Sequence, residues 1–162
     1  KQLQNGIYRI KDGNTTLVLS GMDLGGVPNG IALSPDGKWM YLSTANRQIR
    51  RYAVNSDGTL GAFTMFTEGV GIGDGQKTDV AGNVYSTSGA GPGIVRITSP
   101  GGKLLGTINL PIYGGEPKRQ ICATNEASGG TDVKTLFIAG CDSVYTIQLK
   151  IAGIVPAHNV NK

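Results

Sequence analysis

The sequence predicts an all-β protein that forms one domain, and three observations lead to this prediction. Glycine makes up 26 of the 162 residues, about twice its average usage, yet apolar residues occur in every segment. Short apolar runs are separated by Gly, Pro, Asp and Asn, which favour turns. No window shows apolar residues recurring every three and four positions over the length of a helix.

Thirteen short strands are predicted from these runs, and each contains β-branched or aromatic residues. In chain order they cover residues 6–10, 15–20, 29–34, 39–44, 48–54, 63–67, 75–80, 83–88, 93–99, 103–110, 119–127, 135–140 and 143–149. Asp36, Asp57 and Asp132 lie in turns between two of these strands, so we expect them to stabilise hairpins.

The strands repeat in groups. The segments NGIALSPDGKWMYLST (29–44), GQKTDVAGNVYSTS (75–88) and TNEASGGTDVKTLFIAG (124–140) each combine a strand, a turn and a second strand with an aromatic residue near its start. A further short strand follows each of them: QIRRYAV (48–54), GIVRITS (93–99) and SVYTIQL (143–149). A fourth copy of this last element, GIYRI, covers residues 6–10. A period of about 40–50 residues with four strands per unit is typical of a β-propeller.

Assigning the strands to blades predicts a partial propeller of just over three blades. The strands at 6–10 and 15–20 are the outer half of one blade, two complete blades follow, and the last blade lacks its outer strand. A closed propeller needs at least about four whole blades. Residues 1–162 are therefore expected to be incomplete without an N-terminal half, supplied by a second polypeptide or replaced by a second copy of the chain. Residues 152–162 are expected to form a C-terminal tail.

Composition argues against several classes of function. The formal net charge is +4, but the basic residues are scattered and show no aromatic interleaving, so a nucleic-acid partner is not expected. No apolar run approaches the length of a membrane span. Two cysteines and one histidine, His158, are too few for a zinc site.

Two polar residues directly precede strands that are predicted to be the innermost of their blades. Asn29 lies in VPNG, and Asp74 lies between two glycines in GIGDG. Gly-Asp-Gly is good turn material whatever its function, so the local sequence leaves the role of Asp74 open. Because the two positions are equivalent in consecutive blades, both side chains are expected at the same end of a central channel. Asn125 occupies a related position, for which a structural role is favoured.

The segments PNGIALSPDGKWMYLST, GDGQKTDVAGNVYSTS and GIVRITSPGGKLLGTINLP together resemble the regucalcin (senescence marker protein), gluconolactonase and luciferin-regenerating-enzyme family. The resemblance covers roughly residues 6–151 and matches the C-terminal half of the family's six-bladed propeller. Members hold a divalent metal, usually calcium, in the central channel, and many hydrolyse sugar lactones. The resemblance implies that Asn29 and Asp74 are metal ligands and that Asp74 is also the catalytic base or nucleophile.

This sequence departs from the family pattern at several points. Gly73 stands where a proline is expected, and the run from Ser43 to Ala45 lacks an acidic residue that relatives often carry. Two further family ligands, a Glu and an Asn, have no counterpart in this chain. Calcium takes about six to eight oxygen ligands, so Asn29 and Asp74 would need others.

Three functions are compatible with these residues. The resemblance favours a calcium-dependent lactonase, in which calcium or another divalent cation polarises the ester carbonyl of a small lactone. A phosphotriesterase could use the same site. A non-catalytic propeller that serves as a binding module is the alternative from another class, because a fold does not fix a function.

The two cysteines lie on neighbouring predicted strands. Folding the strands at 119–127 and 135–140 about their turn places Cys122 and Cys141 roughly opposite each other, at a distance that a disulfide can bridge. A disulfide would indicate a periplasmic or secreted protein. Two buried thiols in a cytoplasmic protein are the alternative.

Overall fold

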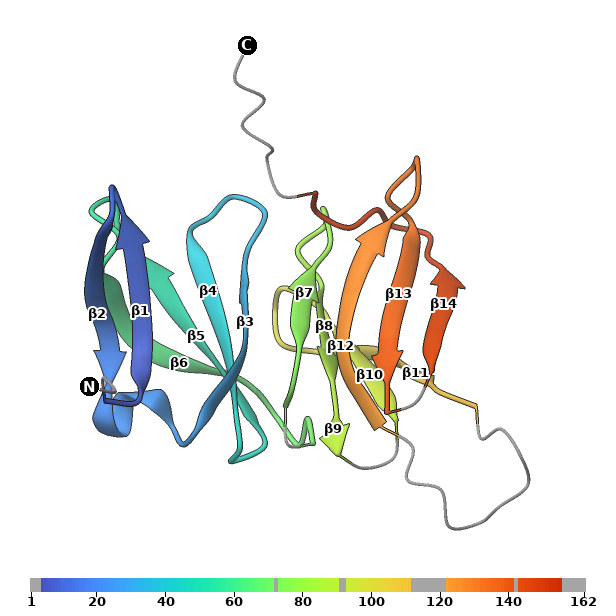
Figure 1. Cartoon of the computed structure of the whole chain (residues 1–162), viewed down its shortest axis with the longest axis horizontal. Helices are drawn as coiled ribbons and strands as arrows, with labels where there is room; N and C mark the ends of the chain where they lie inside the picture. The colour runs from blue at the N-terminus through green and yellow to red at the C-terminus, as the bar shows by residue number, and fades with distance from the viewer. Residues whose placement is uncertain (1–3, 72, 91–92, 112–121, 142, 156–162) are drawn as a thin grey trace.

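The computed structural model describes residues 4–71, 73–90, 93–111, 122–141 and 143–155. They form fourteen β-strands in four antiparallel sheets and one 3₁₀ segment, η1 (Gly21–Leu24), which confirms the predicted all-β fold (Figure 1). Within these ranges, no helix is long and apolar enough to cross a membrane.

Each sheet is built from strands that follow one another closely in the chain. The first pairs β1 (Gly6–Lys11) with β2 (Asn14–Ser20). The second has the order β3 (Pro28–Leu33), β4 (Trp39–Thr44), β5 (Gln48–Val54), β6 (Leu60–Glu68). The third has the order β7 (Gln76–Thr78), β8 (Val84–Thr87), β10 (Ile94–Thr98), β11 (Leu104–Asn109). The fourth has the order β9 (Gly89–Ala90), β12 (Cys122–Gly129), β13 (Thr135–Gly140), β14 (Val144–Gln148).

All thirteen predicted strands are present, with shifted ends, and β9 is an addition. β7 is shorter than predicted because the Asp79 carboxylate accepts hydrogen bonds from the backbone N–H groups of Ala81 and Asn83, at 3.0 and 2.9 Å, which turns the chain. The predicted strand at 119–127 is described only from Cys122 onward, since 119–121 lie outside the described residues. β9 was missed because it has only two residues, which pair with the first two of β12.

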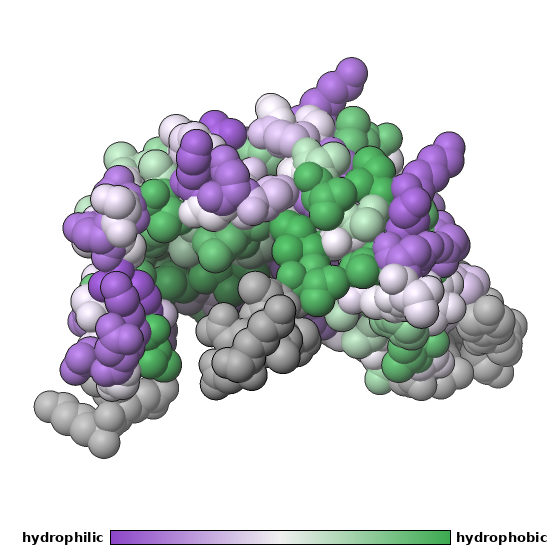
Figure 2. Space-filling view, turned by 90° about the horizontal axis from the view of Figure 1, so that it is seen from above, coloured by the Kyte–Doolittle hydropathy of each residue, from purple (hydrophilic) through white to green (hydrophobic). Residues whose placement is uncertain are grey.

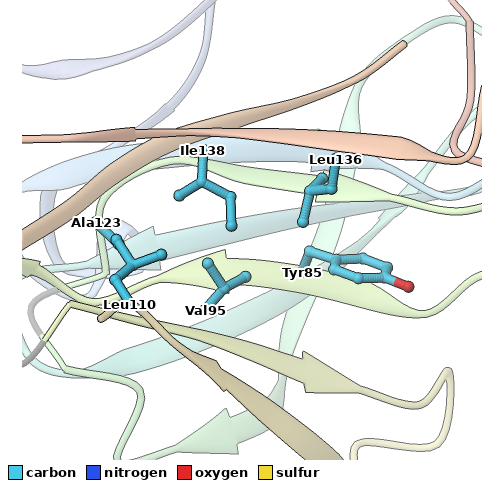
Figure 3. Packing of buried hydrophobic residues seen from close by; sticks show 6 residues of the cluster. All are labelled: Tyr85, Val95, Leu110, Ala123, Leu136 and Ile138. Carbon is cyan, nitrogen blue, oxygen red and sulfur yellow. The ribbon is translucent and has the colours of Figure 1, made fainter. Parts of the chain in front are cut away.

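The hydrophobic core lies between neighbouring sheets, in three separate clusters. Alternate residues of β4 face opposite neighbours: Met40 and Leu42 pack toward β1 and β2, whereas Tyr41 packs with Val84 of the third sheet. The third cluster joins the third and fourth sheets through six buried residues, Tyr85, Val95, Leu110, Ala123, Leu136 and Ile138 (Figure 3). Each sheet is therefore one blade, held to the next by a layer of apolar side chains.

The blades lie side by side along an arc (Figures 1 and 2). β3, β7 and β12 are adjacent on one side of the arc. Hydrogen bonds connect the start of each of these strands to the start of the next, and the Gly75 N–H donates to the Thr124 carbonyl at 2.8 Å. Gln76 Nε2 donates to the Gly30 carbonyl at 2.8 Å, and Thr78 Oγ1 donates to the Leu33 carbonyl at 2.7 Å. The three strands thus run in the same direction. We call the surface that they form the inner wall.

The predicted disulfide between Cys122 and Cys141 is present, with the two Cα atoms 5.3 Å apart. It connects the start of β12 to the residue after β13, next to the paired residues Ala123 and Gly140. The disulfide thereby ties the inner strand of the fourth blade to the turn that precedes β14.

Candidate functional site

The backbone of Asp74 is fixed on both sides just before β7 begins. Its N–H donates to the Thr87 carbonyl at 3.1 Å, and its carbonyl accepts from the Ser43 hydroxyl at 3.1 Å. Ser43 is fully buried, and its oxygen also accepts from the Gly30 N–H at 2.8 Å. The Ser43 side chain therefore joins the start of β3 to the loop that carries Asp74.

Asn29 is held near Asp74 through the residue that follows it in the chain. The next residue is Gly30, where a Cβ would collide with the backbone oxygen of Asp74 and would lie 2.6 Å from Ser43 Oγ. Only glycine allows this close approach. The structure thus brings the two predicted site residues to neighbouring positions at one end of the inner wall, although they come from different blades. The Asn29 side chain is exposed.

The Asp74 carboxylate makes no hydrogen bond or ion pair with the described residues, unlike the turn aspartates. Asp36 accepts from the Ser34 hydroxyl at 2.6 Å, and that hydrogen bond is the main cause that lowers the pKa of Asp36. The Asp57 carboxylate accepts a hydrogen bond from the backbone N–H of Thr59 at 2.9 Å. Asp132 accepts from the Lys134 N–H at 3.0 Å. The predicted hairpin role of these three residues is confirmed, whereas the half-buried Asp74 carboxylate is left available for other contacts.

Lys77 and Asn125 continue the inner wall away from Asp74. Lys77 Nζ donates to the Gln76 carbonyl at 3.2 Å and to Asn125 Oδ1 at 3.3 Å. Asn125 Oδ1 also accepts from the Glu126 N–H at 2.9 Å, which agrees with the structural role expected for Asn125. Asn125 packs against Gly75, where a Cβ would lie 2.8 Å from the Asn125 Cα.

Glu126 is a buried acid behind this wall, with 3 % of its surface exposed. Neither carboxylate oxygen has a hydrogen-bond partner among the described residues. Burial is the main cause that raises the pKa of Glu126 to about 8; the positive charge and backbone N–H of Lys77 lower it, and the charge of Asp74 raises it further. Glu126 is therefore mostly protonated at neutral pH.

The oxygen atoms of Asn29 and Asp74 suit a hard divalent cation such as calcium. The glycine at position 30 lets the residue after Asn29 contact the Asp74 backbone, so the two residues lie in the same part of the inner wall. In the described part of the chain, no group of three or more His, Cys, Asp or Glu side chains is placed to hold a metal. Asn29 and Asp74 thus fit part of a calcium site, whose other ligands would come from elsewhere.

Sequence reasoning overlooked three residues of this site. Ser43 was noted only as part of a run that lacks an acid, yet it connects the strands that carry Asn29 and Asp74. Lys77 and Glu126 were not among the predicted site residues. A charged residue in a predicted inner strand was the available signal for both. His158 lies outside the described residues.

Comparison with known proteins identifies similar sequences that are lactonases by name. The chain is 31% identical to a gluconolactonase of Zymomonas mobilis subsp. mobilis, in an alignment that covers 92% of the chain and 42% of that protein. It is 36% identical to a 6-deoxy-6-sulfogluconolactonase of Pseudomonas putida over 69% of the chain and 37% of that protein. The chain thus spans about two fifths of the length of these relatives.

Solved structures show the same fold. A gluconolactonase of Xanthomonas campestris superimposes with a TM-score of 0.70 at 28% identity, over 89% of this chain and 44% of that one. A calcium-binding protein, regucalcin, from Agrobacterium tumefaciens gives a TM-score of 0.74 at 21% identity, over 92% of this chain and 54% of that one.

The family model described as "SMP-30/Gluconolactonase/LRE-like region" matches residues 1–141, which is most of the chain. This match agrees with the resemblance expected from the PNG and GDG segments and with the blades of the structure. The chain belongs to the SMP-30/gluconolactonase/LRE-like family.

Proposed function

We propose that this chain is part of a sugar-lactone hydrolase in which Asn29 and Asp74 bind a divalent cation, calcium first of all, and Asp74 is the catalytic carboxylate. One observation about Asp74 carries the proposal. Its backbone is fixed by hydrogen bonds with Ser43 and Thr87, whereas its carboxylate has no partner among the described residues. The lactonase names of the relatives support the reaction class.

A calcium ion bound by Asn29 and Asp74 would supply an electrophile that polarises the lactone carbonyl. The chain's own contribution is to fix the backbone next to each of the two ligands, which the hydrogen bonds of Ser43 and the glycine at position 30 achieve. Preorganised ligands of this kind need no rearrangement during the reaction.

Asp74 has two chemically complete roles. As a general base, its carboxylate takes a proton from water while the water oxygen bonds to the carbonyl carbon. The ring C–O bond then breaks, and the ring oxygen takes a proton to give the hydroxy acid. As a nucleophile, a carboxylate oxygen attacks the carbonyl carbon and the ring C–O bond breaks, while the ring oxygen takes a proton from a water molecule. The hydroxide then adds to the Asp74 carboxyl carbon of the resulting anhydride, which releases the hydroxy acid and restores the Asp74 carboxylate. A single turnover in ¹⁸O-labelled water would place label in Asp74 only by the second route.

The site needs more than this chain. We propose that an N-terminal half of the same propeller, as a second polypeptide or replaced by a second copy of this chain, supplies the remaining ligands. The relatives named above are more than twice as long as the segment that they share with it, which supports this proposal.

Hydrolysis of a six-carbon sugar lactone by the completed protein tests the proposal. Asp74→Asn keeps the size and the backbone hydrogen bonds of the residue, so the fold should persist while hydrolysis falls at least about a hundredfold. Asp57→Asn, in an exposed hairpin turn, is the matched control and should retain full activity. Full activity of Asp74→Asn would reject the role of Asp74, and absence of lactone hydrolysis in the unmodified protein would reject the function.

A further inference from the structure

Lys77 is a cation on the inner wall without a carboxylate partner. Its Nζ contacts two neutral oxygens, the Gln76 carbonyl and Asn125 Oδ1. Among the described residues, no carboxylate lies within ion-pair distance of it. Glu126, whose pKa is raised to about 8 by burial, is mostly neutral and does not balance the charge. The ammonium group therefore keeps one free donor, and no carboxylate of the described residues forms an ion pair with it.

The position of Lys77 relative to Asp74 is set by the strand. Lys77 follows Asp74 by three positions of extended chain, which corresponds to about 10 Å between their Cα atoms. The Lys77 side chain leans back toward Asp74, because its partner Asn125 packs on Gly75, the residue that follows Asp74. The ammonium group is thus held on the inner wall beside Asn125, on the side of Lys77 that faces Asp74.

Asn125 adds a donor at the same place. Its Oδ1 is occupied by Lys77 and by the Glu126 N–H, which fixes the orientation of the amide. Its NH₂ group makes no hydrogen bond with the described residues, and the residue is exposed. Lys77 and Asn125 together therefore present N–H donors and one positive charge, which is the chemistry that binds a carboxylate or sulfonate.

Lys77 also borders a cavity of about 480 Å³, which lies beyond Lys77 toward the ends of β3, β7 and β12, on the side away from Asn29 and Asp74. Apolar and small side chains form most of its lining, among them Ala32, Leu33, Pro35, Ala127 and Ile154, and Lys77 is the one charged residue of the lining. A cavity of this size accommodates a small molecule. Figure 2 shows apolar side chains gathered over the middle of the face seen from above.

We propose that Lys77, with Asn125, binds an anionic substituent of the substrate, a carboxylate or a sulfonate at the end of the lactone remote from its carbonyl. The proposal rests on the proposed function, because the carbonyl is taken to lie at Asn29 and Asp74. It makes Lys77 a specificity-determining residue: it contacts the distal group and takes no part in bond breaking.

The test compares two substrates in the completed protein: a neutral six-carbon sugar lactone, and the same lactone with a sulfonate at carbon six. Lys77→Met keeps the stem and removes the charge, so kcat/KM for the sulfonated lactone should fall about tenfold or more, mainly through KM. The neutral lactone should change less than about twofold. Lys77→Arg should retain most of the preference, and Lys103→Met, which removes an exposed charge between β10 and β11, should change neither substrate. An equal effect of Lys77→Met on both substrates would overturn the proposal.

A binding measurement separates this inference from the proposed function. Calorimetric titration with the sulfonated hydroxy acid needs no turnover, and Lys77→Met should weaken its binding about tenfold while the hydroxy acid without the sulfonate, whose one carboxylate lies at the carbonyl end, binds unchanged. If hydrolysis is absent but this selective loss occurs, the anion site stands and the hydrolase does not. If the unmodified protein binds both acids equally, the anion site is rejected whatever the activity. A carboxylated lactone used in the same way shows whether the site distinguishes the two anions.

Discussion

Glu126 and Gln76 occupy equivalent positions in two consecutive blades, yet they differ in what they can donate. Gln76 is buried on β7, and its NH₂ group donates to the Gly30 and Tyr41 carbonyls of the preceding blade at 2.8 and 2.7 Å. Glu126 is buried on β12, and a carboxylate there has no hydrogen to donate. Only the protonated acid resembles the amide, which agrees with the raised pKa of Glu126.

Protonation of Glu126 makes stability depend on pH. The pKa is raised from 4.5 to about 8 in the folded protein, so its contribution is fully present below pH 4.5 and is lost as the pH rises toward 8. At about 1.4 kcal/mol per pKa unit, the loss is on the order of a few kcal/mol. Urea unfolding at pH 5, 6, 7 and 8 should show this decline, and Glu126→Gln should flatten it.

The control for this prediction is Glu68→Gln, at an exposed glutamate whose carboxylate accepts from Gln48. It should leave the slope of stability against pH unchanged. Lys77 and Asp74, the other charged groups that act on Glu126, remain in both variants. An equal slope in the unmodified protein and in Glu126→Gln would show that Glu126 is ionised in the folded state.

At the level of the strands, the sequence pattern was sufficient to predict a strand where its alternate residues pack against the two neighbouring blades. In QIRRYAV, Ile49 packs toward the third sheet and Tyr52 toward the first, since residues three apart in a strand face opposite sides. A two-residue strand such as β9 has no periodicity to detect. It forms because the chain after Ser88 passes the start of β12.

The candidate site was predictable only in part, and the reason is physical. Asn29 lies at the start of the inner strand β3 and Asp74 just before β7, and their polar character is visible in the sequence. The role of Ser43 depends on its complete burial between two blades, and that of Glu126 on the loss of water around it. Neither condition is a property of the local sequence.

Arginines at repeated positions form contacts between neighbouring blades. Arg9 and Arg51 follow equivalent residues, Ile7 and Ile49, by two positions in consecutive blades. Arg9 donates to the Asp57 carbonyl, and Arg51 donates to the Pro100 carbonyl at 3.4 Å, each in the outer turn of the next blade. Part of the basic stretch 47–51 is therefore used in contacts between blades.

The disulfide should stabilise the fourth blade. It closes a loop with a sequence separation of 19 residues, for which loop-closure entropy gives about 3 kcal/mol. Cys122→Ala with Cys141→Ala should lower the free energy of unfolding by about this amount, and reduction of the unmodified protein should have the same effect. Thiol counting under denaturing, non-reducing conditions should find no free thiol. Two free thiols would contradict the bridge and would remove the basis for proposing a periplasmic or secreted location over a cytoplasmic one.

On the scale of the whole molecule, the arc leaves apolar surface uncovered. Ile31 and Leu33 of the inner strand β3 are 48% and 52% exposed, and Val144 on β14 is 72% exposed. The fourth sheet ends at β14, whose outer edge is unpaired within the described residues. A hollow of about 520 Å³ lies beside it, between Leu110 and Ile147. Unpaired edges with apolar neighbours favour association with another chain or strand.

We therefore expect that the 162-residue chain does not persist alone as a monomer of 16.8 kDa. Light scattering should give the mass of a complex with an N-terminal half or of a dimer, and intact mass spectrometry should tell the two apart. Val144→Lys with Ile147→Lys places charge on the exposed β14 surface and should weaken the association, whereas Lys103→Met should not. A monodisperse monomer that is stable in solution would contradict the expectation. It would show that these blades bury enough surface between them to fold without closing a ring.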